Sequence, residues 1–348
     1  MILPHDPTTL LCLMIISLIC LGSWANFFKV AGKWRFELFC FDFALGLFVV
    51  ALILALTAGN LGYDGFDFRD DVMNAGKRQW MFALLAAVIF NFGNMLLIGA
   101  FSVAGLTLAY PVGFGVAFLV GSIISWATGP GVNAAFLSGG CGLLLLAVIL
   151  NCSAYARLGV LKHETQARAG TAKSTRRPSS LQGIILSMVG GVLLGSFVPL
   201  LAKAQDPDVG LGPYSTMVFF GVGVVMSTFV LNLFFMNLPI EGDPLEFSDF
   251  FSGTLKQHAA GFMAGGLWAL GGLAALVATS PKTDTHLQPV TVDMLSQFAP
   301  VLATLFGLVV WREYKAGDVR VKTTSLAMLL LFAGGVVAIS LASAYTRS

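Results

Sequence analysis

Long apolar stretches separated by short polar ones dominate the pattern of this chain. A helix needs about 20 apolar residues to cross the hydrocarbon core of a bilayer, and ten stretches of the 348-residue chain reach that length. They cover residues 8–29, 38–58, 79–100, 103–127, 134–157, 180–204, 213–236, 254–278, 287–310 and 321–343. The pattern predicts an all-α polytopic membrane protein with ten transmembrane helices.

Two of these stretches end in matching sequences. Leu21-Gly22-Ser23-Trp24 lies near the end of the first stretch, and Leu194-Gly195-Ser196-Phe197 lies near the end of the sixth. Five helices per half is an odd number, so the second half enters the membrane with the opposite orientation. We therefore predict two inverted five-helix repeats, residues 1–157 and 180–348, joined by a linker over residues 158–179. Inverted repeats of this kind are typical of secondary transporters.

The distribution of Lys and Arg predicts the orientation. Loops that follow odd-numbered helices hold fourteen of the 20 cations, six of them between Arg157 and Arg177. Cytoplasmic loops carry the excess of Lys and Arg. The basic linker is therefore expected in the cytoplasm and both termini outside, in a cell (inner) membrane that the chain crosses many times.

Composition narrows the function classes. The chain is 57% hydrophobic and 11% charged, against roughly 25% charged in soluble domains. It has no basic tract interleaved with aromatic residues, which argues against nucleic acid as a partner. It also lacks a nucleophile motif, a phosphate-binding loop in a strand–helix context and metal-ligand spacing among its five cysteines. We therefore expect that the protein is not an enzyme and binds no metal or cofactor. We also expect a monomer or homodimer in contact with membrane lipid.

Polar and aromatic residues inside the stretches are the candidates for solute binding. A polar group at membrane depth must find a partner or line a wet cavity. Asn91 and Asn94 are three residues apart, so they share a helix face. They either bind a solute or join helices, and the sequence leaves both readings open. The full set of candidate solute-binding residues is Trp24, Asn26, Asn91, Asn94, Tyr110, Trp268 and Gln297.

Three acidic residues are candidates for proton coupling. Asp42 and Asp293 lie inside predicted helices, and Glu37 lies at a boundary. A carboxyl group in a low-dielectric site can exchange protons near neutral pH. The alternative is an acid at headgroup level, paired with Arg35 or Lys33. The four histidines fall in loops or at helix ends, which predicts no buried histidine relay: His5, His163, His258 and His286.

Three segments resemble the drug/metabolite transporter superfamily. They are Gly22-Ser23-Trp24-Ala25-Asn26, the aromatic-Asp-aromatic sequence Phe41-Asp42-Phe43 within 34–46, and Gln297-Phe298-Ala299-Pro300 running on to Trp311-Arg312-Glu313-Tyr314. The second segment is similar to the start of helix two in ureide permeases and in L-rhamnose–proton symporters. Position 41 is Phe where that branch is expected to have Trp or Tyr. The resemblance implies secondary transport of a small polar solute from a central cavity, often driven by protons.

These observations lead to one functional expectation and one alternative. We expect a secondary active transporter that imports a small polar metabolite, either a sugar or a ureide or nucleobase-like compound, together with protons by alternating access. The alternative is an exporter of amino acids or drugs on the same fold.

Overall fold

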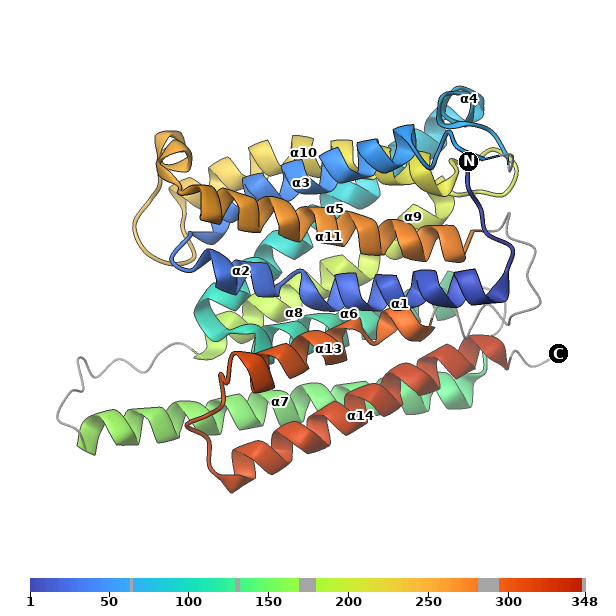
Figure 1. The fold of residues 1–348 in the computed structure, drawn as a ribbon. Coiled ribbons are helices and arrows are strands. Elements are labelled where there is room, and N and C mark those ends of the chain that lie inside the picture. The colour runs from blue at the N-terminus through green and yellow to red at the C-terminus, as the bar shows by residue number, and fades with distance from the viewer. Residues whose placement is uncertain (63–64, 129–131, 169–179, 281–293, 346–348) are drawn as a thin grey trace. The chain divides into compact units, whose positions relative to one another are not determined.

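The computed structural model describes residues 1–62, 65–128, 132–168, 180–280 and 294–345, and the whole of this part is helical or irregular, without strands. Nine helices in it are long and apolar enough to cross a membrane, from Pro7–Ala31 to Val319–Ala342 (Figure 1). A shorter apolar helix, Met294–Val310, lies in the ninth predicted stretch, the start of which is outside the described residues. The all-helical membrane architecture is thus confirmed.

Two helices break at the matching sequences. α1 (Pro7–Ser23) ends before Trp24, and α2 (Asn26–Ala31) continues its course. α8 (Ser180–Ser196) ends before Phe197, and α9 (Val198–Ala204) follows. In the second case Pro199 has no backbone N–H and cannot complete the helical hydrogen bond to Gly195. In the first case the Asn26 side chain donates to the carbonyl of Ser23 at 3.0 Å, which satisfies an acceptor that the break leaves free.

The helices form two compact units, each of which contains segments from both halves of the sequence. The first unit comprises Met1–Met95 and Ser196–Ala299, and the second comprises Leu96–Gly195 and Pro300–Ser348. The predicted repeats therefore do not coincide with the compact units. The boundaries of the two repeats stay a prediction from the sequence.

The first unit is built around three neighbouring helices. These are α3 (Phe36–Leu56), α10 (Pro213–Asn237) and α11 (Leu255–Ala278), with α3 packed against both others and α1 against α11 (Figure 1). The remaining elements of this unit are α2, the short α4 (Phe68–Asn74), most of α5 (Lys77–Ala104), α9 and a 3-10 turn, η1 (Phe247–Ser252).

Glycines bring α3 and α11 into close contact. A Cβ atom on Gly265 would lie 1.9 Å from the carbonyl oxygen of Phe43, and one on Gly46 would lie 2.0 Å from that of Phe262. Neither position can accept a side chain unless the backbones separate. Small residues at such contacts let membrane helices approach closely enough for van der Waals packing. The approach also places the first turns of α3 and α11 against each other.

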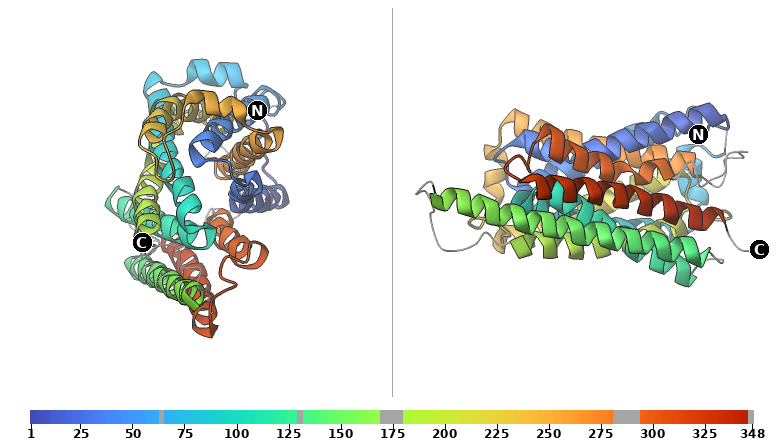
Figure 2. Two further views of the ribbon diagram at one scale, coloured as in Figure 1. Left: turned by 90° about the vertical axis from the view of Figure 1, so that its left-hand side faces the viewer. Right: turned by 90° about the horizontal axis from the view of Figure 1, so that it is seen from below.

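The second unit contains the long pair α7 (Ala134–Arg168) and α14 (Val319–Ala344), which run side by side (Figure 2). Its other elements are α6 (Leu106–Thr128), α8, α13 (Ala299–Leu305) and a π-helical turn, η2 (Phe306–Val310). The Gly191-x-x-x-Gly195 pair of α8 lies against α6, where Cβ atoms would approach the carbonyl oxygens of Gly113 and Ala117 to 2.3 and 2.5 Å.

Glu313 stabilises the start of α6 in this unit. Its carboxylate accepts hydrogen bonds from the backbone N–H groups of Leu106 at 3.1 Å and Thr107 at 2.7 Å. The first N–H groups of a helix have no partner within the helix, and an acid there also interacts favourably with the helix dipole. The carboxylate of Glu313 thus caps a helix about 200 residues away in the chain.

Asp318 provides a pH-dependent prediction. Its carboxylate accepts from Arg157 Nε at 2.9 Å and from the backbone N–H of Val321 at 3.0 Å. The Arg157 hydrogen bond and the α14 cap lower the pKa of Asp318 from 3.8 to about 2. A carboxylate whose pKa is lower in the folded state stabilises that state above the unfolded pKa and loses this effect as pH falls towards the folded pKa. We expect the difference in melting temperature between wild type and Asp318→Asn in detergent to be constant above about pH 4 and to vanish towards pH 2.

The matched control is Asp6→Asn, because Asp6 caps α1 through Thr9 at an exposed site. If the difference in melting temperature between wild type and Asp318→Asn stays unchanged down to pH 2, the ion pair of Asp318 with Arg157 adds nothing to stability.

Candidate functional site

A carboxyl–imidazole pair joins α3 to α11 in the first unit. His258 Nδ1 lies 2.9 Å from one oxygen of Asp42 and 3.1 Å from the other. Trp34 Nε1 donates to the same carboxyl at 3.3 Å. Gly261 allows this contact, because a Cβ atom there would lie 2.4 Å from the Cβ of Asp42. The close packing of α3 and α11 therefore determines which side chains meet.

The pair is sealed on one side and open on the other. The Asp42 side chain is 6% exposed, whereas that of His258 is 28% exposed. The rings of Trp34 and Phe250 pack edge-on against the imidazole, with centroids 5.2 and 4.7 Å away. The imidazole is therefore the more exposed member of the pair. The sequence placed His258 at a helix end, where it is found, but did not predict its contact with Asp42.

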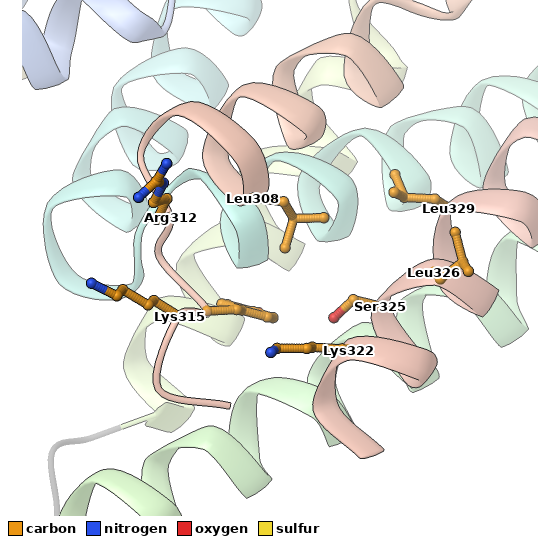
Figure 3. A pocket seen from close by; sticks show the side chains of 8 residues that line it. Leu308, Arg312, Lys315, Lys322, Ser325, Leu326 and Leu329 are labelled. Atoms are coloured by element: carbon orange, nitrogen blue, oxygen red, sulfur yellow. The ribbon is translucent and has the colours of Figure 1, made fainter. Parts of the chain in front are cut away.

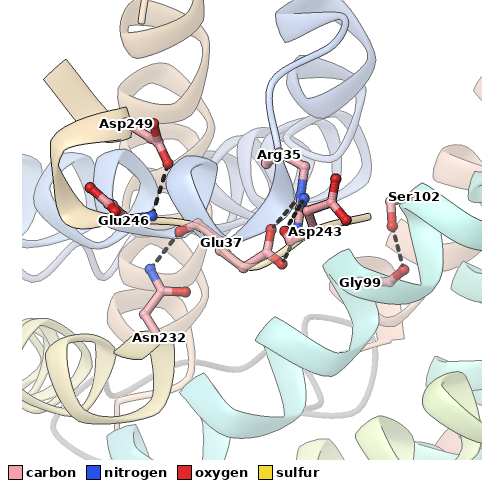
Figure 4. Close-up of polar contacts among 8 residues, drawn as sticks. All are labelled: Arg35, Glu37, Gly99, Ser102, Asn232, Asp243, Glu246 and Asp249. Atoms are coloured by element: carbon pink, nitrogen blue, oxygen red, sulfur yellow. Dashed lines mark hydrogen bonds and ion pairs between the residues drawn. The ribbon is translucent and has the colours of Figure 1, made fainter. Parts of the chain in front are cut away.

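Glu37 has a different environment from Asp42. Its buried carboxylate binds the Arg35 side chain through two contacts, at 2.7 and 3.1 Å. Arg35 also donates to the backbone oxygen of Asp243 at 3.0 Å, and Asn232 donates to the backbone oxygen of Glu37 (Figure 4). This is the pairing with Arg35 that the sequence offered as the alternative to proton coupling. A guanidinium does not release its proton in proteins, so this pair holds the loop to α3.

The two asparagines of α5 have different surroundings. The Asn91 amide donates to Ser227 Oγ and Thr228 Oγ1, each at 2.9 Å, and approaches the carbonyl oxygen of Val224 at 3.3 Å. Its donor group is therefore used in joining α5 to α10. Asn94 is 2% exposed, and its amide nitrogen has no hydrogen-bond partner among the described residues. A buried amide without a partner costs free energy unless a ligand or water completes it.

An aromatic cluster lies one turn from Asn94 along α5. The indole of Trp268 is stacked on Phe220, with centroids 5.4 Å apart and planes 7° apart, and it packs against Phe90 at 4.3 Å. Phe197, at the break between α8 and α9, contacts both phenylalanines. Phe90 and Asn94 are four residues apart and share a face of α5. Trp268 is only half-buried, so part of its surface is available for a planar ring.

The other predicted solute-binding residues are spread over both units. Trp24 is buried in the first unit and packs on Phe43 at 5.2 Å, and Asn26 bonds to Ser23 across the helix break. Gln297 is half-buried near the end of the first unit. Tyr110 belongs to the second unit, where it is stacked between Phe101 and Phe114. The third acidic candidate, Asp293, lies outside the described residues.

No protein-family model matches this chain. Three curated relatives are ureide permeases of Arabidopsis thaliana, each aligned over 96% of this chain and 97% of its own length. Ureide permease 4 is 23% identical, ureide permease 1 is 20% identical and ureide permease 2 is 21% identical. Ureide permease 5 of the same plant is 22% identical over 93% of this chain and 91% of its own.

One solved crystal structure, of a protein without a functional name, has a similar fold. It matches with a TM-score of 0.52 over 99% of this chain and 100% of that chain, at 16% identity. With helices long enough to span a membrane and an alignment over nearly its full length, the chain is a distant homologue of the ureide permeases, which are transporters and not enzymes.

Proposed function

We propose that this protein is a secondary transporter that carries a small, planar, ureide-like or nucleobase-like solute across the membrane together with protons. The observation that carries the proposal is the alignment with ureide permeases over nearly the whole chain. The buried polar groups of the first unit supply the two functions that such a transporter needs, solute recognition and proton exchange.

Solute recognition rests on Asn94 and the aromatic cluster. A ureido group presents N–H donors and a carbonyl acceptor on a planar frame, and a primary amide offers the complementary acceptor and donors. The amide nitrogen of Asn94 has no protein partner within the described residues. Trp268 is half-buried, and in this proposal its exposed part is the surface on which a planar solute stacks. A stacking surface with one convergent polar group is the usual composition of a small-molecule site.

Proton exchange rests on Asp42 and His258. An unpaired carboxylate at membrane depth is costly, and such acids in transporters often take up and release protons. In the proposed cycle, a proton binds to the Asp42–His258 pair when solute is bound and neutralises its negative charge. The neutral pair lowers the free-energy cost of moving α3 relative to α11. Deprotonation through the half-exposed imidazole then resets the site.

We further propose that the fold consists of ten transmembrane helices in two inverted five-helix repeats. The helix breaks at Trp24 and Phe197 fall in the two matching sequences, which supports this proposal. An in-plane two-fold axis would pair equivalent helices, and α3 packs against α10 just as α7 packs against α14. In the predicted order α3 is helix two and α10 is helix seven, and α7 is helix five and α14 is helix ten. Each of these pairs therefore joins a helix of the first half to its expected equivalent in the second.

Uptake into proteoliposomes tests the function. We expect labelled ureides or nucleobases to accumulate when an inward proton gradient is imposed, and the accumulation to collapse when a protonophore is added. Empty liposomes and liposomes with heat-inactivated protein are the controls. Accumulation of sugars instead would place the protein with the sugar–proton symporters, and export of amino acids or drugs would support the alternative function.

The orientation has a separate test. We expect the linker around Arg176 and Arg177 to face the cytoplasm. In a variant without the native cysteines, Ser174→Cys should resist a membrane-impermeant maleimide in intact cells and react after permeabilisation. Rapid labelling in intact cells would show that the predicted orientation is wrong, but it would not contradict the predicted fold.

A further inference from the structure

A cavity of about 360 Å³ opens on the second unit beside the start of α14. All of its lining residues belong to the second unit, whereas the polar groups of the proposed transport site belong to the first. Its walls come from η2, from the loop that follows it and from two turns of α14 (Figure 3). The lining residues are Leu308, Arg312, Tyr314, Lys315, Lys322, Ser325, Leu326 and Leu329.

One end of the cavity is strongly positive. Arg312, Lys315 and Lys322 are exposed, and none of them is within ion-pair distance of a carboxylate in the described residues. The two acids of the same loop have other partners, because Glu313 caps α6 and Asp318 binds Arg157. Three neighbouring cations without counter-charges repel one another, so an anion bound among them is favoured.

The backbone at Arg312 points to the same conclusion. Its φ is +50°, in the left-handed region that L residues with long side chains rarely adopt, and it is the only non-glycine residue with positive φ in the described residues. Strained backbone of this kind is concentrated at ligand-binding sites, where the surroundings hold it in place. Here the strain positions a guanidinium at the rim of the cavity.

The other end of the cavity is apolar. Leu326 and Leu329 follow Lys322 by four and seven residues on α14, and Leu326 is 59% exposed. At 1.5 Å per residue, the cavity extends about 10 Å along the helix from the cation to the last leucine. α14 is long and apolar enough to cross a membrane from Val319 onward, and such a span would place Lys322 at headgroup depth and the two leucines within the hydrocarbon.

We propose that this cavity binds one anionic phospholipid, with the phosphate among Arg312, Lys315 and Lys322 and an acyl chain along Leu326 and Leu329. A soluble anion would use only the positive end and would leave the leucines exposed. A zwitterionic lipid would bring its own cation towards three others. Basic pockets beside transmembrane helices on the cytoplasmic side are known binding sites for anionic headgroups, and the cation distribution of the chain predicts that side for this loop.

Native mass spectrometry of the full-length protein tests the proposal. Protein from nanodiscs that contain equal phosphatidylglycerol and phosphatidylcholine should retain one phosphatidylglycerol molecule. Each Lys or Arg near a membrane surface contributes about fivefold to binding of an anionic lipid, so Arg312→Gln/Lys315→Gln/Lys322→Gln should lower retention by about a hundredfold. The matched control, Arg168→Gln/Lys162→Gln/Lys256→Gln, removes the same charges at exposed positions elsewhere and should retain the lipid.

Leu326→Trp distinguishes lipid binding in the cavity from nonspecific attraction of anionic lipid to the three cations. It fills the apolar end at an exposed position, leaves all three cations in place and should also abolish retention. Equal loss in the two triple variants, no preference for phosphatidylglycerol in the wild type, or displacement of the lipid by millimolar inorganic phosphate would each overturn the proposal. Monodisperse gel filtration of each variant shows that the fold is intact.

Discussion

Asp42→Asn is expected to abolish uphill accumulation of solute while solute exchange down its gradient continues. Asparagine has nearly the shape of aspartate, and its side-chain oxygen can accept from Trp34 Nε1 and from a protonated His258 Nδ1, so the contact between α3 and α11 is preserved. It cannot exchange a proton. Without that exchange the proton gradient no longer drives net transport, but the proposed solute site at Asn94 and the aromatic cluster is untouched. Counterflow measures exchange, and uptake under an imposed proton gradient measures coupling.

Asp71→Asn is the matched control for this prediction. Asp71 is also buried, at 2% exposure, and accepts from the backbone N–H of Gly212 at 2.8 Å through an oxygen that asparagine retains. We expect this variant to accumulate solute at the wild-type rate. If Asp42→Asn does so too, Asp42 is not the coupling acid, and Asp293 becomes the next residue to test.

His258→Gln separates the imidazole from the carboxyl. Glutamine can donate a hydrogen bond to Asp42 but cannot carry a proton between the carboxyl and water. We expect proton-driven accumulation to fall about a hundredfold, the lower end of the range for positioned acid–base groups, and its pH dependence to change, while counterflow remains. Wild-type accumulation and an unchanged pH profile would show that His258 merely holds Asp42 in place.

The second large effect is expected from Asn94→Ala compared with Asn91→Ala. Asn94 has no partner for its amide nitrogen among the described residues, so its removal should not weaken the fold. If that amide binds solute, its loss leaves a solute group unpaired at a cost of roughly 1–3 kcal/mol, or about 5- to 150-fold in affinity. Equilibrium binding to purified protein and the concentration dependence of uptake both measure this change.

Asn91→Ala should show the opposite pattern. It removes the hydrogen bonds to Ser227 and Thr228 that join α5 to α10. Such bonds between membrane helices contribute about 0.6 kcal/mol on average and at most about 1.7 kcal/mol. We expect a lower melting temperature in detergent and unchanged solute affinity in the protein that remains folded. A loss of affinity in Asn91→Ala with no change in melting temperature would exchange the roles of the two residues.

Apolar length and composition alone determined that this chain is an all-helical membrane protein. A 20-residue apolar stretch has one way to satisfy its backbone in lipid, which is to form a helix, so the prediction does not depend on the neighbours of that helix. The repeated sequence was visible in the same way, but the stretches 8–29 and 180–204 were predicted as unbroken helices, and only the structure shows the breaks at Trp24 and Phe197.

Only the tertiary structure distinguished the roles of the individual polar residues. Asn91 and Asn94 have the same side chain on one face of one helix. α10 supplies partners for the amide of Asn91, whereas the amide nitrogen of Asn94 has none in the part of the chain that the structure describes. The sequence placed His258 at a helix end. Only the close packing of α11 at Gly261 brings its imidazole to Asp42. Periodicity and composition describe a residue's own helix, whereas a hydrogen bond depends on the partner across the interface. That partner is set by close packing between segments about 130 to 220 residues apart in the chain.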